Sequence, residues 1–416
     1  MRILFVTFPL ASHHFQMVPL EWACRVAGHE VRVASTPSLV DTIVGSGLPA
    51  VPVGKDIDLA GISTKGRLKS WHEQERWPDD WPIHPERLDA GHHGLLENIA
   101  GLQFTMAEAM IDDLVAYAEQ WRPDLVVHDA VSFAGPVVAA AVGVPNVSHL
   151  WGSPGPQRIH LRGLGTEPLP GYEALFERVG AETRSEPSAW VDPCPPGMRY
   201  PVEGAPCFGQ RYIPYNGQGT IPDWLFDPPT RRRVCVTWGA STSMLLGAEM
   251  VALFRQVIDA VTAFDVEVVV AMNATLRDLA GELPEGTRPL ISVPLNAVLP
   301  TCDAVVHHGG AGTTLTAVSA GIPQLGITRR PEPSINGIRL AATGAGRHLH
   351  NFEVPDGEAG VALLRNEVAA LLGDPSYQDG AKRLRDAMAA QPTPMETVRA
   401  LENLVPAAKH ERQGER

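Results

Sequence analysis

The chain has 416 residues, which is enough for two or three domains with substantial hydrophobic cores. Hydrophobic residues make up 44% and charged residues 19%, so the composition is that of a globular protein and not of a disordered one. Acidic residues outnumber basic ones, 47 to 34, and the resulting net charge of −13 argues against nucleic acid as a partner and against docking on anionic lipid.

The cysteines are scattered, and no Cys-x-x-Cys pair occurs, so neither a zinc ribbon nor a dithiol motif is indicated. An odd, scattered count is typical of a reducing compartment, where we expect each cysteine to be a small buried apolar residue. No apolar stretch reaches the roughly 20 residues of a membrane span, and we therefore expect a cytoplasmic protein without a membrane partner. The five cysteines are Cys24, Cys194, Cys207, Cys235 and Cys302.

Strands and helices alternate along residues 1–150. The first apolar run, 3–8, has the continuous hydrophobicity of a strand that is buried on both faces. The alternation predicts a parallel, doubly wound sheet. The predicted strands are 3–8, 30–34, 49–53, 124–128 and 146–149. The predicted helices are 18–27, 37–44, 105–120 and 133–142.

Two segments interrupt this pattern. Residues 55–100 predict a long excursion from the sheet with a helix only near its end. The tryptophans there, at 71, 77 and 81, either line an apolar pocket or anchor the excursion to the body, and the sequence favours neither. Residues 151–232 are rich in proline and glycine, which predicts loops, a peripheral helix and a link to a second domain near 214–229.

A second alternating set begins at residue 234. It predicts another Rossmann-like domain, which faces the first across a cleft. The charged tail, 409–416, is expected to fray. The predicted strands are 234–238, 267–271, 304–307 and 323–327. The predicted helices are 248–262, 312–320, 335–343, 361–372 and 376–404.

A glycine-rich turn, 307–314, lies between a predicted strand and a predicted helix. Glycines allow the backbone to approach a diphosphate, and the free N–H groups and dipole at a helix start favour its negative charge. A bare glycine-rich turn that merely permits packing is about as common as an anion site. The flanking donors His308 and Thr313 favour the anion site here.

Two familiar phosphate-binding motifs are missing from the sequence. No Gly-Lys-Ser/Thr follows the turn, which excludes a P-loop. No Gly-x-Gly-x-x-Gly occurs there or in the first strand-to-helix turn at 8–15, so a NAD or FAD cofactor is not expected.

Six short motifs occur together in this chain. They are His308-x-Gly310-x-x-Thr313, Val293-Pro294-Leu295, Gly321-Ile322-Pro323-Gln324, Val18-Pro19-Leu20 with Trp22, Ala27-Gly28-His29-Glu30-Val31 and Arg211-Tyr212-Ile213-Pro214-Tyr215-Asn216-Gly217. The set resembles GT-B glycosyltransferases, in particular the actinomycete natural-product branch that attaches deoxysugars to macrolides, anthracyclines and related polyketides. The resemblance covers essentially the whole chain and is weakest over 55–100 and 151–205, where the family varies with its acceptor.

The resemblance implies a GT-B fold: two Rossmann-like, doubly wound α/β domains with the active site between them. Residues 1–213 would form the acceptor-binding domain, 214–232 the linker and 233–392 the nucleotide-sugar-binding domain. Residues 393–416 would form a helix that crosses back to the first domain, followed by the frayed tail.

The resemblance also implies a nucleotide-sugar site in the second domain. Val293 would contact the base through backbone groups, and the loop after strand 234–238 would bring Ser241 and Thr242 to the phosphates. Many relatives have Asp-Gln where this chain has Glu332-Pro333, and that pair reads sugar hydroxyls. Glu332 keeps the carboxylate, whereas the proline cannot donate, which is compatible with a deoxysugar. The diphosphate would be held by His308, Gly310, Gly312 and Thr313.

A histidine–aspartate pair is the candidate catalytic base. His13 and His14 follow the first strand at the carboxyl edge of the sheet, where open α/β folds bind ligands. On an extended segment only one of the two would face the cleft. Asp129, which ends a later strand, would fix the imidazole tautomer and stabilise its charged form. Sequence alone makes a chance pairing about twice as probable as a dyad; the family resemblance, which places the general base at His13, reverses that order.

Metal-binding alternatives are weak. His92-His93 and His307-His308 are adjacent and not spaced as helical ligands would be. Asp56-x-Asp58 resembles the metal-binding Asp-x-Asp of GT-A enzymes, but a solvated acidic turn is about five times more probable in this fold plan. We therefore expect no catalytic metal and no cofactor beyond the sugar donor.

The expected function is inverting transfer of a deoxyhexose from a nucleoside diphosphate, dTDP above all, to a hydroxyl of an apolar, polyketide-like aglycone. Charge on the leaving group would be stabilised by the turn at 308–313. An auxiliary activator protein and a homodimer are further expected partners. The alternatives are a GT-B nucleotide-sugar epimerase, or a non-catalytic subunit that binds nucleotide or aglycone.

Overall fold

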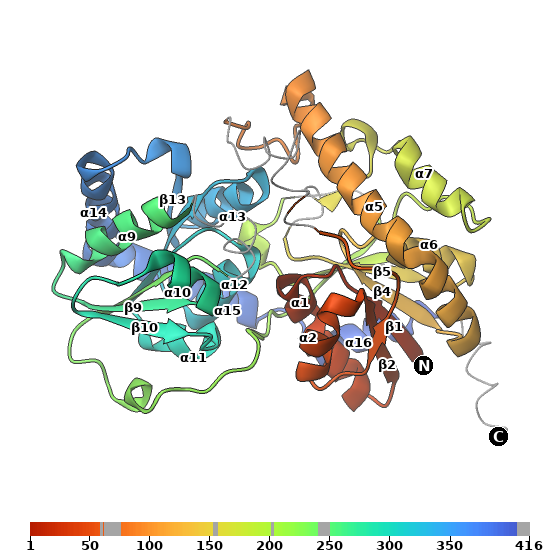
Figure 1. Ribbon diagram of the computed structural model, residues 1–416, viewed down its shortest axis with the longest axis horizontal. Helices are drawn as coiled ribbons and strands as arrows, with labels where there is room; N and C mark the ends of the chain where they lie inside the picture. The colour runs from red at the N-terminus through yellow and green to blue at the C-terminus, as the bar shows by residue number, and fades with distance from the viewer. Residues whose placement is uncertain (59–60, 62–75, 153–156, 201–203, 240–249, 406–416) are drawn as a thin grey trace.

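The computed structural model describes residues 1–58, 61, 76–152, 157–200, 204–239 and 250–405 (Figure 1). Two parallel sheets form the centres of two helix-covered halves. In the first the strand order is β3-β2-β1-β4-β5-β6-β7, and in the second it is β10-β9-β8-β11-β12-β13. These are two Rossmann-like α/β domains, so the predicted fold class is confirmed.

The first sheet contains two strands that the sequence analysis did not predict, β6 and β7. Its strands are β1 (Arg2–Val6), β2 (Glu30–Ser35), β3 (Ala50–Pro52), β4 (Leu125–Asp129), β5 (Asn146–His149), β6 (Ala189–Asp192) and β7 (Cys207–Gly209). The helices around it are α1 (Ala11–Val26), α2 (Val40–Gly45), α5 (Ala90–Trp121), α6 (Ala134–Ala141) and α7 (Pro170–Glu177).

The second sheet also contains two unpredicted strands, β10 and β13, one at each edge. Its strands are β8 (Arg233–Thr237), β9 (Glu267–Met272), β10 (Thr287–Ile291), β11 (Ala304–His307), β12 (Gln324–Thr328) and β13 (Gly346–His350). The helices are α9 (Val251–Thr262), α10 (Ala274–Ala280), α11 (Leu295–Val298), α12 (Ala311–Ala320), α13 (Pro331–Ala342), α14 (Glu358–Gly373), α15 (Pro375–Ala389) and α16 (Pro394–Glu402).

Helix α1 begins seven residues earlier than predicted, because Pro19 lies inside it and not at its first turn. Proline removes one backbone hydrogen bond from a helix interior, so the packing of α1 must compensate for that loss. Met17, Leu20 and Cys24 on α1 are buried in one apolar cluster with strands β1 and β2. Tertiary packing therefore overrides the local signal of the proline.

Helix α5 is 32 residues long and begins at Ala90, well before the predicted start at 105. The Asp89 side chain accepts a hydrogen bond from the His92 N–H, and the His92 ring accepts one from the Asp89 N–H in return. This capping box starts the helix near the end of 55–100, where a helix was expected, and the helix continues without a break through the predicted helix 105–120.

The last helix packs against the first. The predicted helix 376–404 is two helices, α15 and α16, separated by a break that contains Pro392. Helix α16 lies against α1, and Val398 and Leu401 are buried in the same cluster as Leu20 and Cys24.

A guanidinium also joins the two halves. Arg339 on α13 donates hydrogen bonds to the carbonyl groups of Gly197, Met198 and Arg199 in the first half, at 3.1–3.3 Å. Its guanidinium also lies over the Tyr200 ring, 4.7 Å from the centroid. These contacts fix α13, which carries Glu332, relative to the first half.

Four of the five cysteines are buried and Cys207 is exposed, so the expectation that all five would be buried is wrong for Cys207. Cys207 opens β7, an edge strand, which is covered less completely than the sheet interior. None of the helices in the described parts of the chain is long and apolar enough to cross a membrane.

Candidate active site

A cleft of about 470 Å³ lies between the two halves. Its walls come from the carboxyl ends of strands in both sheets, which is where open α/β folds bind ligands. Helix α1, after β1, contributes one wall, and the turn between β11 and α12 contributes the facing wall. Seven of the residues that the sequence analysis selected line it: His13, Val293, His308, Gly310, Gly312, Thr313 and Glu332.

The predicted histidine–aspartate pair is in direct contact. His13 Nδ1 lies 2.5 Å from Asp129 Oδ2, with the aspartate almost fully buried and the His13 side chain 18% exposed. Asp129 Oδ1 accepts hydrogen bonds from the Val131 N–H at 2.9 Å and from the Trp151 indole N–H at 3.3 Å. Both carboxylate oxygens are thus satisfied, and the His13 ring is held by its Nδ1 side.

The pKa of Asp129 reflects two opposing effects. Burial alone would raise it, but His13 and the hydrogen bonds from Val131 and Trp151 outweigh burial, so the pKa of Asp129 is lowered. The aspartate is therefore an anion beside the imidazole. This arrangement fixes the proton on Nδ1 and leaves Nε2 free to accept one.

The prediction that His13 and His14 lie on an extended segment is wrong, because both lie in the first turn of α1. Successive residues in a helix point about 100° apart, so only one of them faces the cleft. His13 does. His14 is fully buried, with Nε2 3.1 Å from Ser46 Oγ and Nδ1 3.6 Å from Glu21 Oε1. His14 therefore belongs to the core and not to the cleft.

The predicted anion turn opens helix α12. Gly310 is its N-cap residue, and Gly312 and Thr313 lie in its first turn. The first N–H groups of a helix have no partner within the helix, and its dipole is positive at this end. Thr313 lines the same cleft and supplies a hydroxyl. The turn can bind an anion with backbone and side-chain donors together.

Glycines on two sides hold the His308 ring in place. A Cβ at Gly310 would lie 2.4 Å from His308 Nε2, and one at Gly239 would lie 2.5 Å from Cε1. Any larger residue at either position would push the ring away. Burial, with smaller contributions from His307 and Arg330, lowers the pKa of His308 to about 3. The ring is therefore neutral at physiological pH.

His307, the residue before His308, holds the glycine-rich turn in place through hydrogen bonds. His307 Nδ1 accepts a hydrogen bond from the Gly309 N–H at 3.0 Å, and its Nε2 donates to Gln324 Oε1 at 2.9 Å. The Gln324 amide in turn donates to the Thr314 carbonyl at 3.3 Å. This chain of hydrogen bonds fixes the tautomer of His307 and the path of the turn.

Glu332 lies in the first turn of α13 and faces His13 across the cleft. Asn336 Nδ2 donates to Glu332 Oε1 at 3.3 Å. Burial raises the pKa of Glu332 to about 7, although Arg330, His13 and the Asn336 hydrogen bond act against burial. The predicted base and the predicted sugar-reading carboxylate thus border one space.

Val293 lines the cleft wall formed after β10, with Ser292 just before it. Ser292 has φ +54°, in the left-handed region, and its N–H donates to the Met272 carbonyl at 2.9 Å. A strained serine thus presents the Val293 backbone to the cleft. The remaining two predicted residues, Ser241 and Thr242, lie outside the described residues.

The cleft-lining residues that were not selected from the sequence include Gln16 and Arg330. Gln16, one turn after His13 on α1, is 7% exposed, and its Nε2 lies 2.8 Å from the position of a Cβ at Gly312. Helical spacing would have paired it with His13 had α1 been predicted to start at Ala11. Arg330 lies between β12 and α13. The one sequence signal that could have identified it is its position two residues before Glu332.

The motif at 211–217 connects the halves beside the cleft. The Tyr212 hydroxyl contacts the Gly312 carbonyl at 3.3 Å and the Thr316 hydroxyl at 3.2 Å. Asn216 Nδ2 donates to Thr316 Oγ1 at 3.2 Å, and its Oδ1 accepts from the Asn296 N–H at 2.9 Å. The connecting segment is therefore attached to α12 itself.

The tryptophans of the excursion divide between described and undescribed residues. Trp77 and Trp81 are buried in the first-half core and pack edge to face, with ring centroids 5.4 Å apart. These two anchor the excursion to the body. Trp71 lies outside the described residues.

Asp56 and Asp58 lie in an irregular segment, and Asp56 accepts a hydrogen bond from the Ser38 N–H at 2.9 Å. Both aspartates are exposed to solvent, as the favoured interpretation expects. Within the described residues, no group of three or more His, Cys, Asp or Glu side chains is arranged to hold a metal ion.

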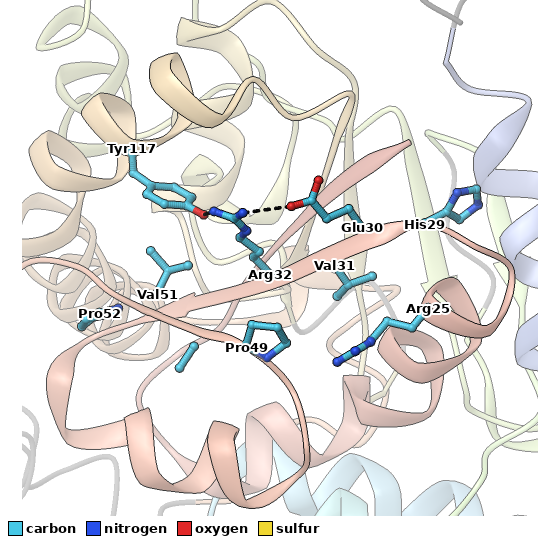
Figure 2. A pocket seen from close by; sticks show the side chains of 10 residues that line it. Arg25, His29, Glu30, Val31, Arg32, Pro49, Val51, Pro52 and Tyr117 are labelled. Atoms are coloured by element: carbon cyan, nitrogen blue, oxygen red, sulfur yellow. Dashed lines mark hydrogen bonds and ion pairs between the residues drawn. The ribbon is translucent and has the colours of Figure 1, made fainter. Parts of the chain in front are cut away.

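A second cavity, of about 640 Å³, lies at the β2–β3 edge of the first sheet (Figure 2). It is lined by Glu30, at the amino end of β2, and by Arg32 and Tyr117. The Arg32 guanidinium is occupied by the Tyr117 hydroxyl at 2.6 Å and by Glu30 Oε1 at 2.9 Å. Arg32, Tyr117 and Glu30 thus satisfy one another, and the cavity lies away from the strand ends that carry His13 and His308.

Comparison with known proteins matches both halves of the chain. The family described as "Erythromycin biosynthesis protein CIII-like" matches with its N-terminal domain over residues 22–239 and its C-terminal domain over 255–404. The aclacinomycin-T 2-deoxy-L-fucose transferase of Streptomyces galilaeus is 39% identical, over 99% of this chain and 97% of that protein. The 10-deoxymethynolide desosaminyltransferase of Streptomyces venezuelae is 37% identical, over 99% and 98%.

Solved structures agree with this match. The glycosyltransferase VinC, in complex with dTDP, is 32% identical with a TM-score of 0.79, covering 97% of this chain and 99% of that one. The spinosyn rhamnosyltransferase SpnG, complexed with thymidine diphosphate, is 30% identical with a TM-score of 0.77, covering 97% and 100%. The chain therefore belongs to the erythromycin biosynthesis protein CIII-like family of GT-B glycosyltransferases, in the actinomycete natural-product branch.

Proposed function

We propose that this glycosyltransferase moves a deoxysugar from a dTDP-activated donor to a hydroxyl of a polyketide-type aglycone, with inversion at the anomeric carbon and without a metal or further cofactor. The observation that carries the proposal is the position of the His13–Asp129 pair opposite the α12 turn and Glu332 in one cleft. Support for the donor comes from relatives whose structures contain thymidine diphosphate.

The first half would supply the base. His13 Nε2 accepts the proton of the acceptor hydroxyl as the oxygen forms its bond to the anomeric carbon. The Asp129 anion stabilises the imidazolium that results. Phe8 and Trp151 lie beside the His13 ring, with centroids 5.1 and 5.3 Å away, and give the acceptor side an apolar wall.

The second half would supply donor binding and leaving-group stabilisation. As the bond between the anomeric carbon and the phosphate oxygen breaks, its electron pair goes to the diphosphate. The N–H groups at the start of α12, together with His308 and Thr313, stabilise that charge. Glu332 accepts a hydrogen bond from a sugar hydroxyl. With Pro333 beside it unable to donate, this pair recognises fewer hydroxyls than Asp-Gln does.

The decisive test is a transfer assay that combines dTDP-deoxyhexoses with macrolactone and anthracyclinone aglycones. Product formation, with the anomeric configuration opposite to that of the donor and retained turnover in EDTA, would support the proposal. The assay is run with and without an auxiliary activator protein from a related pathway. Turnover of UDP-N-acetylglucosamine without acceptor would instead identify an epimerase. Tight binding of dTDP and aglycone without turnover under either condition would identify a non-catalytic subunit.

A further inference from the structure

Arg330 is a charged cleft residue that the proposed mechanism does not use, and the opposite charge that acts on it is Glu332. It follows β12 and immediately precedes α13, and it lines the cleft with His308, Gly310 and Glu332. Among the described cleft-lining residues it is the one lysine or arginine. No hydrogen bond or ion pair occupies its guanidinium within the described chain, whereas Arg339, nine residues later, donates to three carbonyls.

The backbone holds Arg330 against the anion turn. Its carbonyl accepts hydrogen bonds from the Ser334 N–H at 3.0 Å and the Ser334 hydroxyl at 2.8 Å, which fix it as the N-cap residue of α13. A Cβ at Gly309 would lie 2.4 Å from Thr328 Cγ2 and 3.3 Å from Pro333 Cβ. The loop that carries Arg330 is therefore packed directly on the turn that opens α12.

Arg330 differs in charge from the other cleft residues that face a donor diphosphate. His308 is neutral, because burial lowers its pKa to about 3. Helix α12 offers only the partial charge of its dipole. The Glu332 carboxyl, with a pKa of about 7, adds negative charge as the pH rises. A diphosphate that gains charge during bond cleavage thus finds one full positive charge among the described lining side chains, on Arg330.

We propose that the Arg330 guanidinium binds the diphosphate of the sugar donor and stabilises the charge that develops on it as the glycosidic bond to phosphate breaks. The planar guanidinium can donate two parallel hydrogen bonds to phosphate oxygens, which an ammonium cannot match. Arg330 is close enough to both His308 and Glu332 to shift their pKa values, so it can reach the phosphate and sugar parts of the site. This inference rests on the proposed function, since it needs a nucleoside diphosphate donor.

The first test measures binding. Isothermal titration with dTDP and with thymidine is carried out on wild type, Arg330→Gln, Arg330→Lys and Arg329→Gln. Arg329 does not line the cleft, so its variant controls for the change in net charge. We expect Arg330→Gln to bind dTDP about 10- to 100-fold more weakly, the contribution of hydrogen bonds to a charged group. Thymidine affinity should be unchanged, Arg330→Lys should lie between, and Arg329→Gln should match wild type.

A second test separates charge stabilisation from structural support. Arg330→Ala should lose turnover in the transfer assay, and millimolar guanidinium chloride should restore part of it, whereas an equal concentration of sodium chloride should not. A folded Arg330→Gln variant with wild-type dTDP affinity and turnover would overturn the proposal. So would equal losses of dTDP and thymidine binding, or turnover that guanidinium does not restore. Failure of wild type itself to bind dTDP would instead overturn the donor assignment, and this inference with it.

Discussion

His13 and Asp129 lie 116 positions apart in the chain, and their side chains meet at 2.5 Å. One is in the first turn of α1 after β1, and the other is the last residue of β4, the strand that pairs with β1. Parallel pairing brings the carboxyl ends of neighbouring strands to one edge. The contact thus follows from the register of the sheet, in which Ile3 lies beside Leu125.

Removal of either partner should affect the chemical step more than donor binding. His13→Ala is expected to lower turnover roughly 10²- to 10⁴-fold, and Asp129→Asn should act in the same direction because it frees the imidazole tautomer. The double variant should fall far short of the product of the two losses, since the pair acts as a unit. Steady-state kinetics, with dTDP affinity measured in parallel, provide the test.

His14→Ala is the matched control, because its side chain is buried and faces away from the cleft. It leaves the buried Ser46 hydroxyl and Glu21 carboxyl without their neighbour, so we expect a lower melting temperature. The folded fraction should retain turnover at moderate temperature. If the His14→Ala variant were folded but inactive while the His13→Ala variant remained active, the base would have been assigned to the wrong residue.

Gly310→Ala should displace the His308 ring, because the added Cβ would lie 2.4 Å from Nε2. We expect weaker dTDP binding of similar size to that of His308→Ala, about 1.5–3 kcal/mol. Gly101→Ala, in the middle of α5 with no atom within 4 Å of the new Cβ, should leave binding unchanged. It should stabilise the protein by about 0.5–1 kcal/mol. Calorimetry and thermal unfolding test both, and normal dTDP affinity in Gly310→Ala would remove His308 from the site.

Glu332 should make stability depend on pH. Its folded pKa of about 7 lies above the ordinary 4.5, so the folded state holds this proton more tightly than the unfolded state. Its contribution to the free energy of unfolding is therefore complete below pH 4.5 and is lost as the pH rises to about 7. Glu332→Gln removes this loss and should be about 1–3 kcal/mol more stable than wild type at pH 8. Urea unfolding at pH 5 and pH 8 measures the difference.

The same residue should separate sugar recognition from nucleotide binding. Glu332→Ala should lower turnover with a deoxysugar donor while dTDP affinity stays close to that of wild type, because the carboxylate acts on the sugar and not on the phosphates. Comparison of transfer rates and dTDP dissociation constants decides the matter. Equal losses in both would place the carboxylate in support of the phosphates or the fold.

The buried centre of each sheet was predictable because its strands are continuous apolar runs. The four missed strands lack that signal. β10 contains Pro289 and has only Leu290 buried, and β13, with two histidines and an arginine, is polar. Both are edge strands, which are less buried than central strands, so their sequences need not be continuously apolar. β7 is an edge strand of three residues, and β6 has four residues in a proline-rich stretch. Both are too short to show a hydrophobic periodicity in the sequence.

Motif spacing located the site better than secondary structure did. The turn at 308–313 and Asp129 were identifiable because glycines and a terminal carboxylate mark strand ends. Pro19 concealed the start of α1, since a proline inside a helix is rare, and this error placed His13 and His14 on an extended segment. Gln16 and Arg330 carry no motif, and their roles depend on which loops the fold packs together.

Helix α16 belongs to the sequence of the second half but to the core of the first, where Val398 and Leu401 cover α1. During synthesis, the apolar face of α1 therefore stays uncovered until the last helix of the chain has been made. Exchange of acceptor domains between relatives faces the same constraint. A hybrid divided at the linker alone would pair α1 of one parent with α16 of another, and the mismatch would fall on the helix that holds His13. Hybrids in which α16 comes from the same parent as α1 retain the native contact.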